Sequence, residues 1–339
     1  MTDKLIELKN INMYYQKTSG IFSKEKKFHV LKDINLSLKR GEILAVVGES
    51  GCGKTTIGKI ITGLLKPSSG ELNFEGKSVY KTFITGDDNF RHSVQFIQQD
   101  SYAALNPVKT IYQSLAAPIQ AFNKKMTRVE VRDRVIQVLE EVGLKPAEQF
   151  MSKFPHQLSG GQRQRVLMSR ALTQNPKVIV ADEPVSMIDV SLRLSILNLM
   201  IRLNKEKNIS FVYITHDLGT ARYIANVGRI AVMYLGEVVE LSSVTNLIDH
   251  PRHPYTQALL SAVPVPDPKI ARQVKPVKIK SMDLMNLEHR NTGCAFYDRC
   301  PYGTKDCIKE DIAYRKVNND LVKCCNVDII PEYHSGYES

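Results

Sequence analysis

A glycine-rich segment near the start of the chain has the residue types and the spacing needed to bind phosphate. Eight residues, Gly48-Glu49-Ser50-Gly51-Cys52-Gly53-Lys54-Thr55, match the pattern G-x-x-x-x-G-K-[ST] at every fixed position. The glycines let backbone N–H groups turn toward phosphate oxygens, and a helix that starts here adds positive charge. Lys54 is placed to reach the β- and γ-phosphates, and the Thr55 hydroxyl to ligate Mg²⁺. With Thr56, which follows directly, these residues form a predicted site for a nucleoside triphosphate.

Two acidic residues follow an apolar run of strand length. Residues 178–181 are continuously apolar, as in a buried parallel strand, and Asp182 and Glu183 come directly after them. Ligands bind at the carboxyl ends of strands in open α/β sheets. We therefore expect Asp182 to hold Mg²⁺ through water and Glu183 to polarise an attacking water as a general base. A further apolar run, residues 209–214, brings His216 to the same edge, where we expect it to contact the γ-phosphate.

A second candidate anion site is the segment Leu158-Ser159-Gly160-Gly161-Gln162. Ser159 is a favourable N-cap for the helix expected over 163–172, and the two glycines leave the start of that helix open to a phosphate. One anion site per chain is enough to bind a nucleotide. A second one, far along the sequence, indicates that nucleotide is held between two chains.

These motifs, in this order, resemble the ATP-binding cassette family over residues from about 4 to 250. The resemblance implies that Tyr15 stacks on adenine, with Tyr14 as the alternative. It implies that Gln99 reaches Mg²⁺, together with Thr55 and Asp182, and signals to a membrane partner. It also implies that residues 158–162 face the nucleotide of the partner cassette.

The segment Ser186-Met187-Ile188-Asp189 resembles the family loop that couples two opposed cassettes. The usual form of that loop is S-A-L-D, so Met187 and Ile188 depart from it while Asp189 is intact. Ser101 likewise stands where the family has a proline. Neither change removes a catalytic group. The intact Glu183 and His216 argue against a regulatory cassette that binds ATP without turnover.

The pattern of the chain predicts an α/β fold, a P-loop NTPase with a RecA-like core, an antiparallel β subdomain and an inserted helical subdomain at about 101–162. An amphipathic helix is expected over 129–142, closed by Gly143, and a loop of an early hairpin over 16–30. We predict an ATPase domain at 1–255 and a small cysteine-rich extension at 256–339, with a stiff linker at Pro264–Pro268. No second cassette is visible in the sequence, so two chains are expected to pair.

Composition favours a globular protein without a membrane span. The chain has 339 residues, 43% of them apolar and 24% charged, and no run approaches the roughly 18 apolar residues that a spanning helix needs. Its start lacks the apolar segment of a signal peptide. We expect a peripheral protein at the cytoplasmic face of the cell membrane. The net charge of +11 is scattered, and we interpret it as solvated surface with some attraction to anionic lipid rather than as a nucleic-acid site.

Five of the six cysteines lie in the C-terminal part: Cys294, Cys300, Cys307, Cys324 and Cys325. Disulfides are rare in a reducing compartment, so a metal or iron–sulfur site is suggested. The spacing lacks the short C-x2-C pairs of most structural zinc sites. Spacing alone leaves three alternatives open, namely an iron–sulfur cluster, zinc and unliganded thiols.

The stretches 253–260 and 293–301 resemble the C-terminal extension of oligopeptide and dipeptide importer ATPases, and the form GESGCGKT resembles their F-type subunit. This resemblance implies a [4Fe-4S] cluster on Cys294, Cys300, Cys307 and Cys324, with Cys325 as the alternative to Cys324. We expect the cluster to be structural, because ATP hydrolysis needs no redox step. The resemblance also implies a D-type ATPase partner, two transmembrane permeases and an extracytoplasmic binding protein. Cargo of nickel-chelates or oligosaccharides is the alternative to peptides. A soluble cassette protein of translation or DNA repair is disfavoured, because no second cassette is visible.

Overall fold

A computed structural model of the chain describes residues 3–17, 26–81, 89–263, 276–281, 292–309 and 312–333. The predicted linker at Pro264–Pro268 and residues 18–25 of the expected hairpin loop lie outside these ranges. The described residues form two compact units. The helical unit comprises those within Lys39–Glu42 and Val79–Tyr213, and the phosphate-loop unit comprises those before, between and after these ranges. Across the described ranges, no helix combines the length and apolar character needed to cross a membrane.

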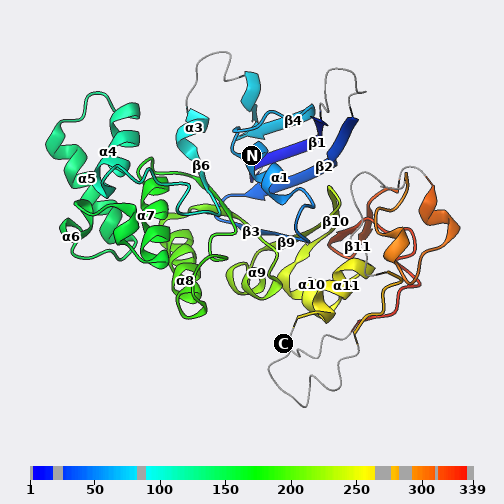
Figure 1. Ribbon diagram of the computed structural model, residues 1–339. Helices are drawn as coiled ribbons and strands as arrows, with labels where there is room; N and C mark the ends of the chain where they lie inside the picture. Colours follow the sequence, from blue (N-terminus) through cyan, green and yellow to red (C-terminus); the bar gives the residue numbers. More distant parts are fainter. Residues whose placement is uncertain are drawn as a thin grey trace. The chain divides into compact units, whose positions relative to one another are not determined.

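One sheet of the phosphate-loop unit has the strand order β2-β1-β4-β5 (Figure 1). Its strands are β1 (Lys4–Lys17), β2 (Lys26–Lys39), β4 (Ser69–Phe74) and β5 (Lys77–Ser78). β1 pairs antiparallel with β4, so that Ile6 lies opposite Phe74 and Leu8 opposite Leu72. These four side chains are buried, because alternate residues of each strand face the core. This is the antiparallel β subdomain that the sequence predicts.

The other strands of this unit follow the order β11-β12-β10-β9-β3. They are β3 (Ile43–Val47), β9 (Arg229–Tyr234), β10 (Glu237–Ser243), β11 (Arg315–Val317) and β12 (Asp320–Val322). β3 is parallel to β9, whereas β12 is antiparallel to β10. All five residues of β3 are buried, in line with its continuous apolar sequence. The C-terminal strands therefore extend the sheet that contains the strand before the glycine-rich loop.

Helices and short 3₁₀ turns complete the phosphate-loop unit. They are α1 (Lys54–Ile61), α9 (Leu218–Ile224), α10 (Val244–Asp249), α11 (Pro254–Ser261), η3 (Tyr297–Arg299) and η4 (Lys305–Ile308). α11 begins with Pro254 at its first position, where the missing N–H costs nothing. The side chain of His253 accepts a hydrogen bond from the Tyr255 amide over 3.1 Å and caps the helix.

The helical unit contains the parallel pair β6 (Val94–Ile97) and β7 (Val178–Asp182), with the first residues of β8 (Ser210–Thr215) next to β7. Its helices are α3 (Asn89–Ser93), α4 (Ile111–Phe122), α5 (Arg128–Glu141), α6 (Glu148–Met151), η1 (Pro155–Gln157), α7 (Gly160–Leu172) and α8 (Val190–Lys207). The amphipathic helix predicted at 129–142 is α5, and Gly143 follows its end with a φ of +82°.

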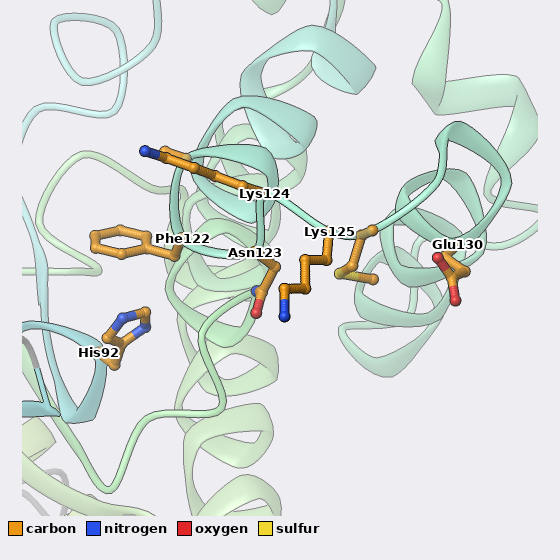
Figure 2. Close-up of a pocket in the computed structure, with 8 residues that line it drawn as sticks. His92, Phe122, Asn123, Lys124, Lys125 and Glu130 are labelled. Carbon is orange, nitrogen blue, oxygen red and sulfur yellow. The ribbon is translucent and has the colours of Figure 1, made fainter.

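A pocket of about 700 Å³ opens between α3, the end of α4 and the start of α5 (Figure 2). The rings of His92 and Phe122 face each other edge to face, with centroids 4.2 Å apart. Lys124, Lys125 and Glu130 give the remaining wall its charge. None of the catalytic, nucleotide-binding or metal-binding residues predicted from the sequence lines this pocket.

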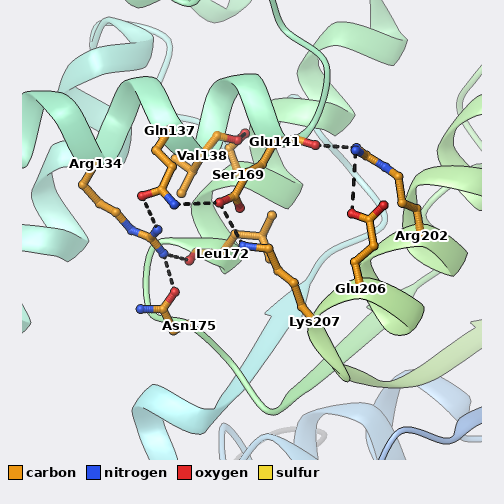
Figure 3. Close-up of polar contacts among 10 residues, drawn as sticks. All are labelled: Arg134, Gln137, Val138, Glu141, Ser169, Leu172, Asn175, Arg202, Glu206 and Lys207. Atoms are coloured by element: carbon orange, nitrogen blue, oxygen red, sulfur yellow. Dashed lines mark hydrogen bonds and ion pairs between the residues drawn. The ribbon is translucent and has the colours of Figure 1, made fainter.

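Polar contacts attach α5 to α7 and α8 within the helical unit (Figure 3). Arg134 donates to the carbonyl of Leu172 at 2.7 Å and to the side chain of Asn175 at 2.6 Å. Lys207 of α8 forms an ion pair of 2.8 Å with Glu141. Hydrogen bonds and an ion pair therefore fix α5 against α7 and α8, in addition to the packing of their buried apolar faces.

Candidate functional site

The glycine-rich loop lies between β3 and α1, as the sequence predicts. Gly51 has a φ of +81° and Gly53 a φ of +103°, backbone conformations that residues with a Cβ rarely adopt. A Cβ at Gly53 would lie 2.7 Å from the Leu31 side chain, so there is no space for one. The shape of the loop therefore depends on glycine at positions 51 and 53.

Lys54 lies inside this loop and is only 6% exposed. Its ammonium donates to the carbonyl oxygens of Gly48 and Glu49, each at 2.8 Å. A buried ammonium at the start of an eight-residue helix is a donor set that suits the anionic phosphates of a nucleotide. Thr55 is exposed on the first turn of α1, whereas Cys52 is 2% exposed and faces the core. The loop residues therefore fit a nucleoside triphosphate.

On either side of the lysine, Ser50 is exposed and Thr56 is partly exposed. Further out in the same unit, Tyr14 and Tyr15 are adjacent on β1 and similarly exposed, at 43% and 42%. Tyr14 stacks on His29 with ring centroids 4.1 Å apart, so one face of its ring is occupied. His216 is exposed directly after β8, and Asp217 caps α9 by accepting from the amide of Gly219 at 2.8 Å.

In the helical unit, the structure brings Gln99 and Glu183 together. The Gln99 side-chain amide donates to the Glu183 carboxylate over 2.8 Å. Glu183 has a φ of +44°, an unfavourable conformation for a residue other than glycine. Ser186 contributes to holding it, because its hydroxyl donates to the Glu183 carbonyl at 3.0 Å. Backbone strain of this kind costs about 1–3 kcal/mol and is concentrated at functional sites.

Two aspartates predicted for the site occupy different environments. Asp182 is the last residue of β7 and is 4% exposed. Asp189 precedes α8 as its N-cap residue and is exposed, and its side chain makes no capping hydrogen bond. Near it, Met187 is 59% exposed. Met187 and Asp189 are thus open to contact with another molecule, whereas Ile188 between them is buried and Asp182 is enclosed.

The segment 158–162 forms the start of α7. Ser159 is its N-cap, as the sequence predicts, and accepts from the Gln162 amide at 3.3 Å. The Gln162 side chain accepts from the Ser159 amide at 3.0 Å, which completes a capping box. Leu158 is buried and Gly160 partly exposed, while a Cβ at Gly161 would press on Leu192 at 3.2 Å. Ser159 itself is exposed.

Sequence reasoning missed two arginines of α7 that hold the segment after Gln99. The guanidinium of Arg163 lies 3.5 Å from the ring centroid of Tyr102 and also donates to the carbonyl of Leu158. Arg170 donates to the carbonyl of Ala104 at 2.6 Å. The loop that follows Gln99 is thereby tied to the helix of the glycine motif. The signal in the sequence was that Arg163 and Arg170 lie at helical spacing beside apolar residues such as Val166 and Leu167, where an arginine needs a polar partner.

The predicted iron–sulfur cluster is wrong. The described residues contain no group of three or more His, Cys, Asp or Glu side chains that could hold a metal ion. The Cys307 sulfur lies 3.1 Å from that of Cys325, which the predicted ligand set includes only as the alternative to Cys324. Burial raises the pKa of Cys294 and of Cys324 to about 12. Cys300 is 7% exposed and its pKa is also raised by burial. The ligand set that the family resemblance implied is therefore contradicted by the described residues.

Solved structures place this arrangement among ATP-binding cassettes. A dimeric post-hydrolysis structure of the cassette MJ0796 with ADP and Pi matches 70% of this chain and 98% of that one, with a TM-score of 0.60 and 32% identity. A second dimeric structure of MJ0796 matches with 33% identity and the same TM-score. The fold and loop thus define a P-loop ATPase of the cassette class, as predicted.

Family models match residues 31–186 as "ABC transporter" and residues 239–307 as "Oligopeptide/dipeptide transporter, C-terminal region". The oligopeptide transport ATP-binding protein AppF of Bacillus subtilis is 39% identical, over 91% of this chain and 93% of its own. OppF of Escherichia coli is 37% identical over 96% of both chains, and DppF of the same organism is 37% identical over 96% and 95%. The chain belongs to the ABC transporter family, as an ATPase coupled to transport.

Membership confirms the expected resemblance to F-type subunits, because these relatives carry the F designation. It implies ATP and Mg²⁺ as the nucleotide and its ion, and membrane permeases as partners.

Proposed function

We propose that this protein hydrolyses ATP to power the import of peptides. The observation that carries the proposal is the match of residues 239–307 to the C-terminal region of oligopeptide and dipeptide transporters. Relatives that align over nearly their whole length are named for oligopeptide or dipeptide transport. A match restricted to the cassette would support transport alone, without a class of cargo.

In this proposal the chain pairs with a D-type ATPase subunit and acts on two transmembrane permeases. A binding protein outside the membrane delivers the peptide. The chain is peripheral, at the cytoplasmic face of the membrane, and its helical segment at about 101–162 contacts the permease. The ATPase domain spans 1–255 and the extension 256–339.

The residue roles follow the chemistry of each side chain. Glu183 is the general base and His216 contacts the γ-phosphate. Thr55, Gln99 and Asp182 serve Mg²⁺, and Tyr15 stacks on adenine. Tyr15 is preferred to Tyr14 because the Tyr14 ring is already stacked on His29. Ser159 and its neighbours in 158–162 face the nucleotide of the partner subunit, and Asp189 couples the two cassettes.

Reconstitution tests the cargo. The chain would be assembled with its partner ATPase and permeases in liposomes, and uptake of labelled peptides measured with and without ATP. We expect ATP-dependent peptide uptake that is lost in Lys54→Ala, because the ammonium that binds phosphate is gone. Uptake of nickel-chelates or oligosaccharides with no uptake of peptides would contradict the proposal.

A further inference from the structure

An ion pair joins the C-terminal extension to the glycine-rich loop within the phosphate-loop unit. The Arg299 guanidinium lies 3.0 Å from both carboxylate oxygens of Glu49, although 250 positions separate the two residues. Glu49 is the second residue of the loop motif, directly after Gly48. The extension therefore places a positive charge against the only acidic residue of the eight-residue motif.

Arg299 is held in place by several contacts. Its side chain is 8% exposed, compared with 28% for Glu49. The same guanidinium nitrogen lies 3.3 Å from the hydroxyl of Tyr234, and the rings of Tyr234 and Phe296 lie 5.7 Å from the guanidinium carbon. The side chain is therefore positioned by packing, unlike the two long flexible chains of an exposed ion pair.

A second contact from the same region fixes the backbone of Glu49. The Glu49 amide donates to the hydroxyl of Tyr255, in α11, over 3.0 Å. Tyr255 is 1% exposed, and its ring packs on Tyr234 and Phe296 with centroids 4.6 and 5.4 Å away. One aromatic cluster thus carries both the arginine that meets the Glu49 side chain and the hydroxyl that meets its backbone.

The charge of Glu49 matters because the loop binds a polyanion. A carboxylate beside the phosphates repels them, and at a partly buried position this repulsion is weakly screened. A paired arginine cancels the charge while leaving the loop its own donors, the Lys54 ammonium and the backbone amides. The pair is thus suited to a role in nucleotide affinity as well as in folding.

We propose that Arg299 is a positioning residue of the nucleotide site, which neutralises Glu49 and thereby sets the affinity of the loop for ATP. High-affinity binding then requires the C-terminal extension to be docked. The inference depends on the ATPase site and not on the transported cargo, so failure of peptide transport would leave it intact.

Binding of MgATP to the full-length chain, measured by calorimetry, tests the role of the charge. Arg299→Met keeps the length of the side chain and removes its charge. We expect its Kd for MgATP to rise about tenfold, because Glu49 is left as an uncompensated negative charge. In the double variant Glu49→Gln with Arg299→Met, the Kd should return to within about threefold of the wild-type value, because the repulsive charge is gone as well.

Arg315→Met is the matched control. Arg315 also lies in the extension and pairs with Asp328 at 2.7 Å, but both side chains are largely exposed, so its Kd should stay at the wild-type value. Wild-type affinity in Arg299→Met would overturn the proposal, and so would a double variant that binds as weakly as Arg299→Met.

If Arg299→Met fails to fold, Glu49→Gln alone decides the matter. It leaves the contacts of Arg299 with Tyr234 and Phe296 in place and frees its positive charge from the carboxylate, so this variant should bind MgATP more tightly than the wild type. Weaker binding by Glu49→Gln would overturn the proposal.

Discussion

The side-chain amide of Gln99 donates a hydrogen bond of 2.8 Å to the carboxylate of Glu183. The donor follows β6 and the acceptor follows β7, two parallel strands whose carboxyl ends meet at one edge. The contact orients the carboxylate of Glu183, a residue whose backbone has a positive φ. A change in the segment after β6 would therefore change the position of the proposed general base.

Replacing Gln99 tests this link. Gln99→Ala removes the donor, and we expect steady-state ATP hydrolysis by the assembled complex to fall about tenfold, the value of one hydrogen bond to a charged group. The Kd for ATP without Mg²⁺ should change little, because binding depends mainly on Lys54 and the loop amides. Hydrolysis at the wild-type rate would show that the contact has no role in turnover.

Ser159 provides a test of pairing between two chains. Ser159→Arg puts a long charged side chain at the exposed start of α7, and we expect it to block the site bounded by the lysine of the partner subunit. ATP binding by the isolated variant chain should stay normal. Asn198→Arg, at an exposed polar position of α8 outside the segment 101–162, is the control and should leave the complex active. Loss of ATP binding in the isolated Ser159→Arg chain would contradict the assignment.

Glu240 gives a prediction about pH and stability. Burial raises the pKa of its carboxyl to about 7, although the amides of Arg252 and His253 donate to it at 2.9 Å each. A raised pKa in the folded state means stability that is complete below the unfolded value of 4.5 and lost as the pH rises through about 7. Wild type should therefore lose roughly 3 kcal/mol across this range from this group.

Glu240→Gln keeps the shape of the side chain without the titration. We expect its free energy of unfolding, relative to wild type, to rise by roughly 3 kcal/mol between pH 4.5 and pH 8 in urea titrations. His253, whose pKa burial lowers to about 3, is common to both proteins and cancels in this difference. An equal difference at both pH values would contradict the prediction.

Local features of the chain could be predicted from the sequence. The strand, the glycine loop and the helix from Ile43 to Ile61 each follow from short-range patterns, and Ser159 carries the signature of an N-cap. The positive φ of Glu183 could not be foreseen, because only the surrounding fold imposes it on a residue that disfavours it.

Long-range pairings escaped prediction for a similar reason. Arg299 and Glu49 meet although 250 positions separate them, and no local pattern of the sequence reports such a contact. The cysteines illustrate the opposite error. The resemblance to peptide-importer ATPases implied a cluster, yet the fold sets Cys307 against Cys325, which the implied ligand set includes only as an alternative.

The central claim is that Glu183 is the general base of an ATPase that drives transport. Single-turnover hydrolysis of ATP by the assembled complex carrying Glu183→Gln measures it most directly. We predict normal ATP binding, hydrolysis slowed by at least about 100-fold and a trapped closed dimer with bound ATP. The same substitution is made at the corresponding carboxylate of the partner subunit, so that hydrolysis at a second site cannot mask the loss. Hydrolysis at the wild-type rate in that doubly substituted complex would contradict the claim.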